Sequence, residues 1–551
     1  MIFLNRLIQE IDTRSPLHYN QSINMTAVIF KKLSEEGMFM KAAGKNVSEN
    51  AAAPKMKGFL GTIERIGNAL PHPFILFLYI TGALMVLSAV LAGMGVQVTN
   101  PTTGKVVAVR SIISRDGLVW LLQNMLKNFS NFAPLGLVLA MQMAIGLAEG
   151  AGLLTTFMRK AILGVPLWAL SATVLFLGIN GSIASEASII VVPALAAAAF
   201  QAVGKNPLAG LIAGYAATNA GFTAAVILTG TDALLYGVTE QAAQLIDPSV
   251  TLTPAINWYF MIISCFTLTA VGVFVNDRII TPRLGVYQGT EKAEERQITD
   301  MESKGLRKTG LFTIFFLFLL LLCLVPENGL LRGKGGSIIN SPFINGLVPI
   351  LILYFVLAGI VYGKTVGTIK DMNQVPVMMA DSLRSLTGYI VLVFVIAQFI
   401  AMFGYTNLGM VIAVNAADAL KNAGFTGIPL VLGMILLTTL VNFVMTSGSA
   451  KWYIFAPIFV PMFMLLGYSP AFAQVVYRIG DSCSNPITPI YPYLPIVIGM
   501  AQKYNKETGI GTIISLMLPY SIAFLLVWIV QVCVWMAFNL PLGPGAGVYL
   551  H

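Results

Sequence analysis

Charged residues are scarce in this chain. Asp, Glu, Lys and Arg make up 10% of its 551 residues, whereas hydrophobic residues make up 56%. A soluble protein carries about a quarter charged residues, so the composition excludes an ordinary soluble protein. Long apolar runs occupy residues 73–91, 311–325, 348–361 and 513–538. Because they are continuous rather than alternating, and approach or exceed the roughly 20 residues that cross a bilayer, they predict transmembrane helices and not a barrel.

Histidine and cysteine are also rare. The three histidines, His18, His72 and His551, lie outside the predicted spans, which excludes a histidine proton relay within the membrane. The four cysteines are far apart and form no C-x-x-C pair, so no disulfide framework or zinc site is indicated. The apolar segments contain no nucleophile–base pair or metal-ligand cluster. We therefore expect no cofactor and no enzyme activity.

The positive charge lies mainly in short loops. Lys and Arg gather at residues 159–160, 277–308 and 364–370, and the formal net charge is +9. The positive-inside rule explains this pattern better than nucleic-acid binding does, and it places the N-terminus in the cytoplasm. We expect four segments: a cytoplasmic polar tail at 1–57, a first transmembrane half at 58–283, a cytoplasmic charged linker at 284–309, and a second transmembrane half at 310–551.

Two regions, one in each half, have small polar residues, prolines and glycines at matching positions. Residues 185–219 and 449–482 each begin with small polar residues, contain Pro193 or Pro457, and turn at a Gly-x-x-Pro sequence. We interpret the prolines as interruptions and predict two re-entrant helical hairpins, at about 184–204 and 447–468, in an inverted repeat. This arrangement is typical of transporters whose substrate binds between interrupted helices near the bilayer midplane.

Ionisable residues within apolar segments need a partner or a task, because a charge at the bilayer centre costs at least about 2.5 kcal/mol. Arg478 and Asp481 stand three residues apart on one helical face, so they can form an internal ion pair. Alternatively, Arg478 binds a substrate carboxylate while Asp481 holds a coupling cation, and both can hold in different states. Asp232 either caps a helix that starts at Ala233 or takes part in proton coupling, and neither role excludes the other.

Three further residues each allow two interpretations. Trp452 is a packing or interface residue, or a stacking platform for an aromatic ring. Lys451 reaches out to water, or pairs with Glu186 of the other hairpin. Asn442 makes an interhelical hydrogen bond, or offers a neutral oxygen to sodium or to a substrate amide. The one metal site left open by the sequence is a sodium site near Asp481 and Asn442.

Several segments resemble the p-aminobenzoyl-glutamate transporter (AbgT) family. They include KNFSNFAPLG at 127–136, GTDALL at 230–235, the long run at 456–482 that ends in VVYRIGDS, and LPLGPG at 540–545. The resemblance implies an all-α polytopic protein with about nine transmembrane helices and two re-entrant hairpins, assembled as a homodimer in the bacterial inner membrane. The residues that correspond to functional positions of the family are Asp232, Asn442, Ser449, Trp452, Pro470, Arg478, Asp481 and Pro489.

The expected function is secondary active transport of p-aminobenzoyl-glutamate-like aromatic amido-acids or sulfonamide-type antimetabolites. Arg478 suits the substrate carboxylates, Trp452 suits the benzoyl ring, and Asp232 with Asp481 suits coupling to a proton or sodium gradient. Lys451 and Glu186 depart from the family's usual pattern. The alternatives are an ion-coupled dicarboxylate carrier of related hairpin architecture and, with less support, a channel or a membrane-embedded enzyme.

Overall fold

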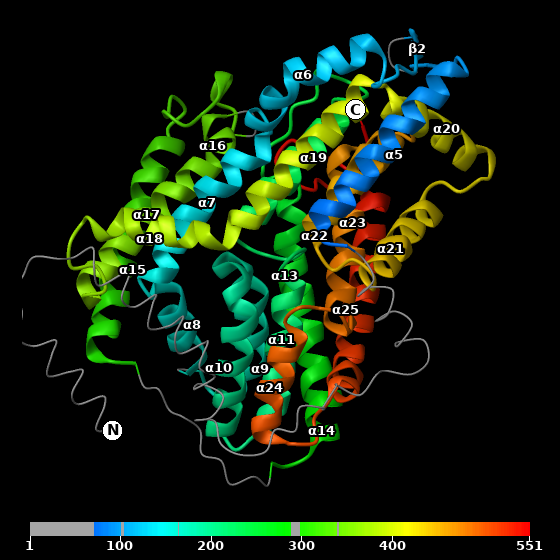
Figure 1. Ribbon diagram of the computed structural model, residues 1–551. Helices are drawn as coiled ribbons and strands as arrows, with labels where there is room; N and C mark the ends of the chain where they lie inside the picture. The colour runs from blue at the N-terminus through cyan, green and yellow to red at the C-terminus, as the bar shows by residue number, and fades with distance from the viewer. Residues whose placement is uncertain (1–70, 101–103, 164, 288–297, 339–340, 551) are drawn as a thin grey trace, which may run out of the picture. The chain divides into compact units, whose positions relative to one another are not determined.

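The computed structural model describes residues 71–100, 104–163, 165–287, 298–338 and 341–550. The chain divides into two units, Met1–Gly58 and Phe59–His551, and all described residues belong to the second. The predicted cytoplasmic tail at 1–57 therefore lies outside the described residues. The described part is mostly helical, with one short antiparallel pair formed by β1 (Gln97–Thr99) and β2 (Val106–Ala108) (Figure 1).

The helices follow one another with short connections. Those of the first half are α5 Pro73–Gly93, α6 Arg115–Ser130, α7 Ala133–Gly150, α8 Leu153–Leu163, α9 Leu170–Ile179, the 3₁₀ segment η1 Asn180–Ala187, α10 Ser188–Ala202, α11 Pro207–Ala220, α12 Gly230–Ala243, α13 Trp258–Val275, the π segment η2 Asn276–Ile280 and α14 Thr281–Leu284. Those of the second half are α15 Asp300–Leu324, η3 Lys334–Gly336, α16 Pro342–Asn345, α17 Leu347–Val366, α18 Gln374–Leu383, η4 Arg384–Leu386, α19 Thr387–Tyr405, α20 Leu408–Asn422, α21 Ile428–Asn442, α22 Gly448–Leu465, α23 Pro470–Ser484, η5 Asn485–Ile487, α24 Leu494–Tyr504 and α25 Ile510–Phe538.

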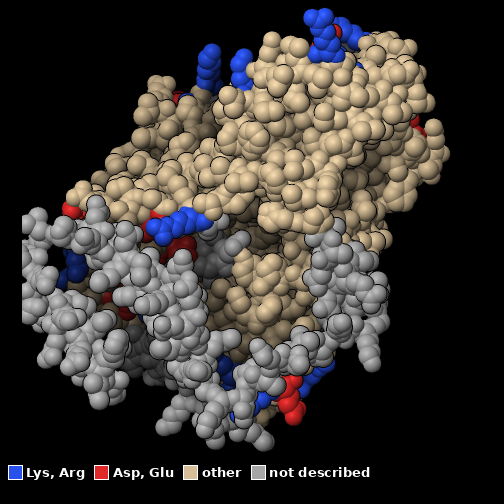
Figure 2. Space-filling view, in the orientation of Figure 1, with Lys and Arg blue, Asp and Glu red and all other residues tan. Residues whose placement is uncertain are grey.

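Eight helical segments of the described chain are long and apolar enough to cross a membrane. Further apolar helices, including α10 and α21, are shorter. In α15 only 6% of the apolar window is buried, so this helix presents its side chains outward. Figure 2 shows a broad face without charge, with Lys, Arg, Asp and Glu gathered toward its edges. Many large hydrophobic side chains are also exposed, and an exterior of this kind suits hydrocarbon and not water. The predicted all-α polytopic membrane fold is confirmed.

The two predicted Gly-x-x-Pro turns are present, and each joins two consecutive helices. Gly204 and Gly467 have φ angles of 76° and 89°, in the left-handed region that favours glycine. After each glycine a polar side chain caps the next helix: Asn206 accepts from Leu208 N at α11, and Ser469 accepts from Phe472 N at α23. A proline follows at the first helical position in both cases. Pairs α10–α11 and α22–α23 pack together as a result.

The predicted interruptions at Pro193 and Pro457 are wrong. Both prolines lie inside continuous helices, α10 and α22. A proline removes one backbone hydrogen bond, and membrane helices tolerate this where neighbouring helices compensate. In α10 the neighbour is close: a Cβ added to Gly214 of α11 would lie 2.9 Å from Pro193 Cα. The breaks lie elsewhere, at residues 221–229 between α11 and α12, and at residues 485–493 between α23 and α24.

The same succession of elements occurs in both halves. In the first half, α10, the turn at Gly204 and α11 are followed by the break at 221–229. In the second half, α22, the turn at Gly467 and α23 are followed by the break at 485–493. Every residue of α11 and α23 is buried, so these equivalent helices form the centre of the packed core. The predicted hairpin ranges contain mainly the first helix of each pair. Helix α15 begins at Asp300, inside the predicted linker at 284–309.

Candidate functional site

Arg478 of α23 is held by the break between α11 and α12. Its Nη1 donates to Asp232 Oδ1 at 2.7 Å, and its Nε donates to the Phe222 carbonyl at 2.8 Å, which also accepts from Nη2. The guanidinium carbon lies 5.2 Å from the centroid of the Phe222 ring. Arg478 is 1% exposed. The guanidinium charge is thus neutralised by the Asp232 carboxylate, and other guanidinium N–H groups donate to the Phe222 carbonyl in the non-helical segment.

Asp232 also caps the helix on which it lies. Its Oδ2 accepts from Thr229 N at 2.8 Å and from Thr229 Oγ1 at 2.9 Å. The helix, α12, begins at Gly230 and not at Ala233, so Asp232 occupies the third helical position and reaches back to the cap residue. The predicted capping role is present in this form. The Asp232 carboxylate therefore holds the end of the 221–229 segment at Thr229 and also neutralises Arg478.

Asp481 pairs with Lys451, so the predicted ion pair between Arg478 and Asp481 is absent. Lys451 Nζ of α22 contacts Asp481 Oδ1 and donates to Asn442 Oδ1. The Lys451 side chain is 0% exposed, which rules out the predicted reach to water in this structure. The predicted pair of Lys451 with Glu186 involves a side chain that lies outside the described residues.

Asn442 connects the end of α21 to the end of α23. Its Nδ2 donates to Ser484 Oγ at 2.9 Å, to Asn485 Oδ1 at 2.8 Å and to the Asp481 carbonyl at 3.3 Å. Asn485 Nδ2 in turn donates to Asp481 Oδ2 at 3.3 Å. The predicted interhelical hydrogen bonds of Asn442 are present, and its oxygen faces a cation, the Lys451 ammonium.

Trp452 is fully buried and its ring already has a partner. It stacks on Tyr477 of α23, with centroids 4.5 Å apart and planes at 28°. Its Nε1 donates to Thr239 Oγ1 at 3.0 Å, and Thr239 donates to Gln474 Oε1 at 2.6 Å. These contacts lock α22 to α12 and α23. The predicted stacking on a substrate ring is therefore not available in this structure.

Three predicted residues remain, Ser449, Pro470 and Pro489. Ser449 is half-buried near the start of α22, with its hydroxyl 3.5 Å from that of Ser447. Pro470 begins α23, about 12 Å along the helix from Arg478 at 1.5 Å per residue. Pro489 lies in the break after η5 and is partly exposed.

Sequence reasoning missed the residues that hold the charges in place. Phe222 contributes a carbonyl and a ring to Arg478. Thr223 donates to the Arg478 carbonyl at 2.8 Å and shares a short contact with the Ser482 hydroxyl. The available signal was the run of small and polar residues at 216–221, where α11 ends and the unwound segment begins. Backbone ligands leave no side-chain signature, so Phe222 was not identifiable as a partner.

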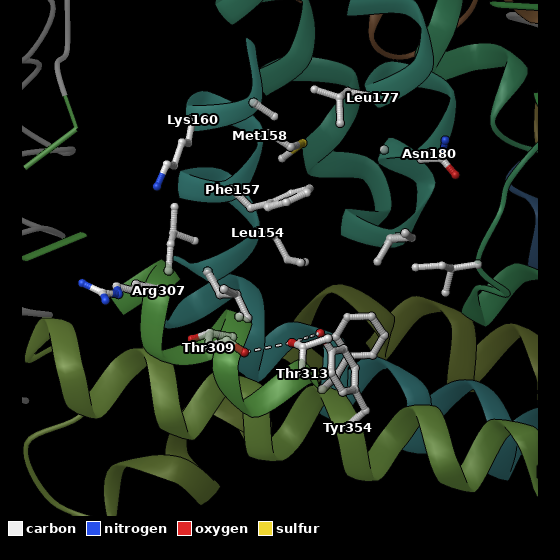
Figure 3. A pocket seen from close by; sticks show the side chains of 18 of the residues that line it. Leu154, Phe157, Met158, Lys160, Leu177, Asn180, Arg307, Thr309, Thr313 and Tyr354 are labelled. Atoms are coloured by element: carbon white, nitrogen blue, oxygen red, sulfur yellow. Dashed lines mark hydrogen bonds between the residues drawn. The ribbon is translucent and has the colours of Figure 1, made fainter. Parts of the chain in front are cut away.

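A large cavity lies beside η1. It has a volume of about 800 Å³ and is bounded by α8, α9, η1, α15 and α17 (Figure 3). Most of its wall is apolar, including Leu154, Phe157 and Met158. Lys160 and Arg307 lie on the same side of it in Figure 3. Within the described chain neither has an ion-pair partner, in contrast to Arg478 and Lys451.

The cavity and the buried charges share one segment of chain. Ile227, in the break after α11, lines the cavity together with Asn180 of η1. Asn180 Oδ1 accepts from Val226 N at 2.8 Å. The same break supplies the Phe222 carbonyl to Arg478. A displacement of this break would therefore act on the cavity wall and on the Arg478 contacts together.

The described residues contain no group of three or more His, Cys, Asp or Glu side chains that could hold a metal ion. The oxygen atoms of Asp481 and Asn442 are the donors that suit an alkali cation, and the Lys451 ammonium contacts one oxygen of each.

Comparison with known proteins gives consistent matches. A family model described as the AbgT putative transporter family matches residues 58–550. The chain is 43% identical over 486 residues to the p-aminobenzoyl-glutamate transport protein of Escherichia coli strain K12, covering 88% of this chain and 96% of that relative.

Two solved structures have the same fold. The Alcanivorax borkumensis YdaH transporter matches with a TM-score of 0.83 and 39% identity, over 86% of this chain and 100% of that one. Neisseria gonorrhoeae MtrF, which represents a class of antimetabolite efflux pumps, matches with a TM-score of 0.83 and 40% identity, over 89% of this chain and 100% of that one.

Proposed function

The chain belongs to the AbgT family of membrane transporters, and we propose that it is a secondary active transporter of p-aminobenzoyl-glutamate-like aromatic amido-acids. It is a transporter and not an enzyme. The observation that carries the substrate proposal is 43% identity along 96% of a p-aminobenzoyl-glutamate transport protein. The predicted substrate residues, Arg478 among them, lie within that family match.

The cavity supports an aromatic anion as the substrate. Such a ligand has one apolar ring and two carboxylates, and it needs an apolar surface with a small number of well-placed cations. Phe157, Tyr354 and Phe355 line the wall, with Lys160 and Arg307 beside them. The wall therefore offers aromatic surface for the ring, and the two cations are available for the carboxylates.

Transport requires Arg478 to exchange one carboxylate for another. In the present arrangement Asp232 occupies the guanidinium, and a substrate carboxylate would compete for the same donors. Protonation of Asp232 removes its charge and leaves the buried cation unpaired, which is costly unless an anion replaces it. Binding of a proton at Asp232 and of a substrate carboxylate at Arg478 are therefore linked. This linkage is our proposal for proton coupling, with Asp481 as the second carboxylate of the coupling machinery.

The position of the break at 221–229 supports the proposal of alternating access. That segment contacts the cavity through Ile227 and Arg478 through Phe222. Movement of the helix pairs against the surrounding helices would open one end of the path while closing the other. We also propose a bacterial inner-membrane location with a cytoplasmic N-terminus, and a homodimer. Light scattering of the purified protein in detergent measures the assembly, and a monomer mass would remove the dimer from the proposal.

Efflux of sulfonamide-type antimetabolites is the second candidate. It is favoured by 40% identity to MtrF over 89% of this chain. The two candidates share the site and differ in the direction of net flux and in the ligand. Competition separates them: a sulfonamide that inhibits uptake of labelled p-aminobenzoyl-glutamate binds the same site, whereas inhibition by succinate alone would instead support the dicarboxylate carrier.

Uptake into proteoliposomes tests the proposal. Purified full-length protein is reconstituted, and labelled p-aminobenzoyl-glutamate is added under a pH gradient, a sodium gradient or neither. The proposal expects saturable uptake that responds to at least one gradient and is lost in Arg478→Ala, while Arg384→Ala, at an exposed pair with Asp381, retains it. Uptake that is indifferent to both gradients, or intact in Arg478→Ala, would contradict the mechanism.

A further inference from the structure

Lys451 occupies an oxygen-lined position that has the features of a cation site. Its ammonium contacts a carboxylate oxygen of Asp481 and the amide oxygen of Asn442. Both side chains are held by other bonds: Asn442 Nδ2 donates to Ser484 and Asn485, and Asn485 donates to the second oxygen of Asp481. The two oxygens are therefore fixed in place independently of Lys451.

Two helix ends meet at this position. Helix α21 ends at Asn442 and helix α23 ends at Ser484. The last carbonyls of a helix carry partial negative charge, which stabilises a cation near them. A carboxylate, an amide oxygen and two carbonyl-rich helix ends are the donors that bind a hard cation such as sodium. The Lys451 ammonium stands where such an ion would bind.

We propose that the Lys451 ammonium is a tethered cation that fills an alkali-cation site formed by Asp481 and Asn442, so that this transporter does not bind sodium there. This deepens the proposed function, because it assigns a cation to the Asp481 part of the coupling machinery. A sodium ion beside the ammonium would place two positive charges on one buried carboxylate. Sodium is therefore excluded while Lys451 stays charged and in place.

Removal of the tethered charge should open the site. In Lys451→Met an unbranched side chain of similar length remains, but Asp481 loses its partner and stays buried. Free sodium would restore the charge balance, and a ligand that binds only the folded state raises the melting temperature in a saturable way. We therefore expect the melting temperature of Lys451→Met to be low without sodium and to rise with sodium to a plateau.

The experiment measures melting temperature and binding of radiolabelled sodium on purified full-length protein in detergent. Sodium chloride replaces N-methyl-D-glucamine chloride at constant ionic strength. Wild type and the exposed-lysine control Lys421→Met should show no saturable effect. Lys451→Met should gain one, and Lys451→Met/Asp481→Asn should lose it again.

The proposal is overturned by saturable sodium binding to wild type that Asp481→Asn abolishes, because the site would then be free. It is also overturned if Lys451→Met folds and binds no sodium. Should Lys451→Met fail to fold, the wild-type measurement still decides. Failure of the proposed function is a separate outcome. If the wild-type protein does not transport p-aminobenzoyl-glutamate, the substrate assignment is wrong, while the sodium measurements still test the role of Lys451.

Discussion

The buried charges and the cavity cations differ in one respect that bears on transport. Arg478 and Lys451 are almost fully buried, and each contacts a carboxylate on another helix. Lys160 and Arg307 border an apolar cavity and have no such carboxylate among the described residues. An incoming anion can therefore meet the cavity cations directly, whereas it must displace an internal carboxylate to reach Arg478. In the proposed mechanism, this difference separates the initial attraction of the substrate from the step coupled to an ion gradient.

The largest effect is expected on breaking the buried pair of Arg478 and Asp232. Arg478→Ala leaves Asp232 as an uncompensated buried charge, which costs about 3–5 kcal/mol. Thermal melting in detergent measures the loss. The matched control is Arg384→Ala, whose partner Asp381 is 52% exposed and whose own side chain is 83% exposed, so the effect is about 0–1 kcal/mol.

A partner test sharpens this result. Arg478→Met/Asp232→Leu removes both charges, and apolar replacement of a buried pair is often neutral. The double variant should be more stable than Arg478→Ala and inactive in transport. A double variant no more stable than Arg478→Ala would show that the unpaired charge is not the cause of the loss.

Truncation of Trp452 should be comparably costly. Trp452→Ala removes the stack on Tyr477 and the hydrogen bond to Thr239, with an expected loss of about 3–5 kcal/mol. Trp168→Ala is the control, because Trp168 is 85% exposed and should change the melting temperature little. If Trp452→Ala keeps wild-type stability and loses only substrate affinity, Trp452 is a substrate platform and its packing role is wrong.

A substitution of Gly448 tests how closely this residue packs against Phe222, which contacts Arg478, and against Asp481, which pairs with Lys451. A Cβ at this position would lie 2.9 Å from Phe222 Cζ and 3.0 Å from Asp481 Oδ2. Gly448→Ala should therefore destabilise the protein by about 1–3 kcal/mol through overpacking. Gly499→Ala on α24, where nothing lies within 4 Å of the added atom, should not. Equal melting temperatures for both variants would contradict the packing.

The smallest effect is expected at the cavity cations. Lys160→Gln and Arg307→Gln each remove a solvent-exposed charge, so we expect a roughly two- to fivefold weaker affinity for p-aminobenzoyl-glutamate. The effect should shrink at high salt. Isothermal titration measures it, with Lys421→Gln as the control. No change in either variant, at low salt, would remove the cavity from the substrate path.

The fold was predictable because the residues that mark its turns and helix starts act locally. Gly204 and Gly467 mark turns that require a positive φ, and Pro207 and Pro470 mark the helix starts that follow. The error at Pro193 has a local cause as well: the sequence shows the missing backbone donor but not the neighbouring helix that compensates for it.

The candidate site was predictable only as a set of residues. Helical spacing correctly places Arg478 and Asp481 on one helix, yet it cannot identify partners that come from other helices. Asp232 is 246 positions away in the chain from Arg478. Phe222 acts through its carbonyl, which any residue has. The choice of partner was therefore set by tertiary packing of α12 and α22 on α23.

The affinity of Asp232→Asn for p-aminobenzoyl-glutamate tests the central claim, that Asp232 and a substrate carboxylate compete for Arg478. Affinity is measured by isothermal titration on purified wild type and Asp232→Asn at one pH. Asp232→Asn should bind more tightly than wild type, because the guanidinium no longer has an internal carboxylate that competes with the substrate. An affinity of Asp232→Asn equal to or weaker than that of wild type would contradict the claim.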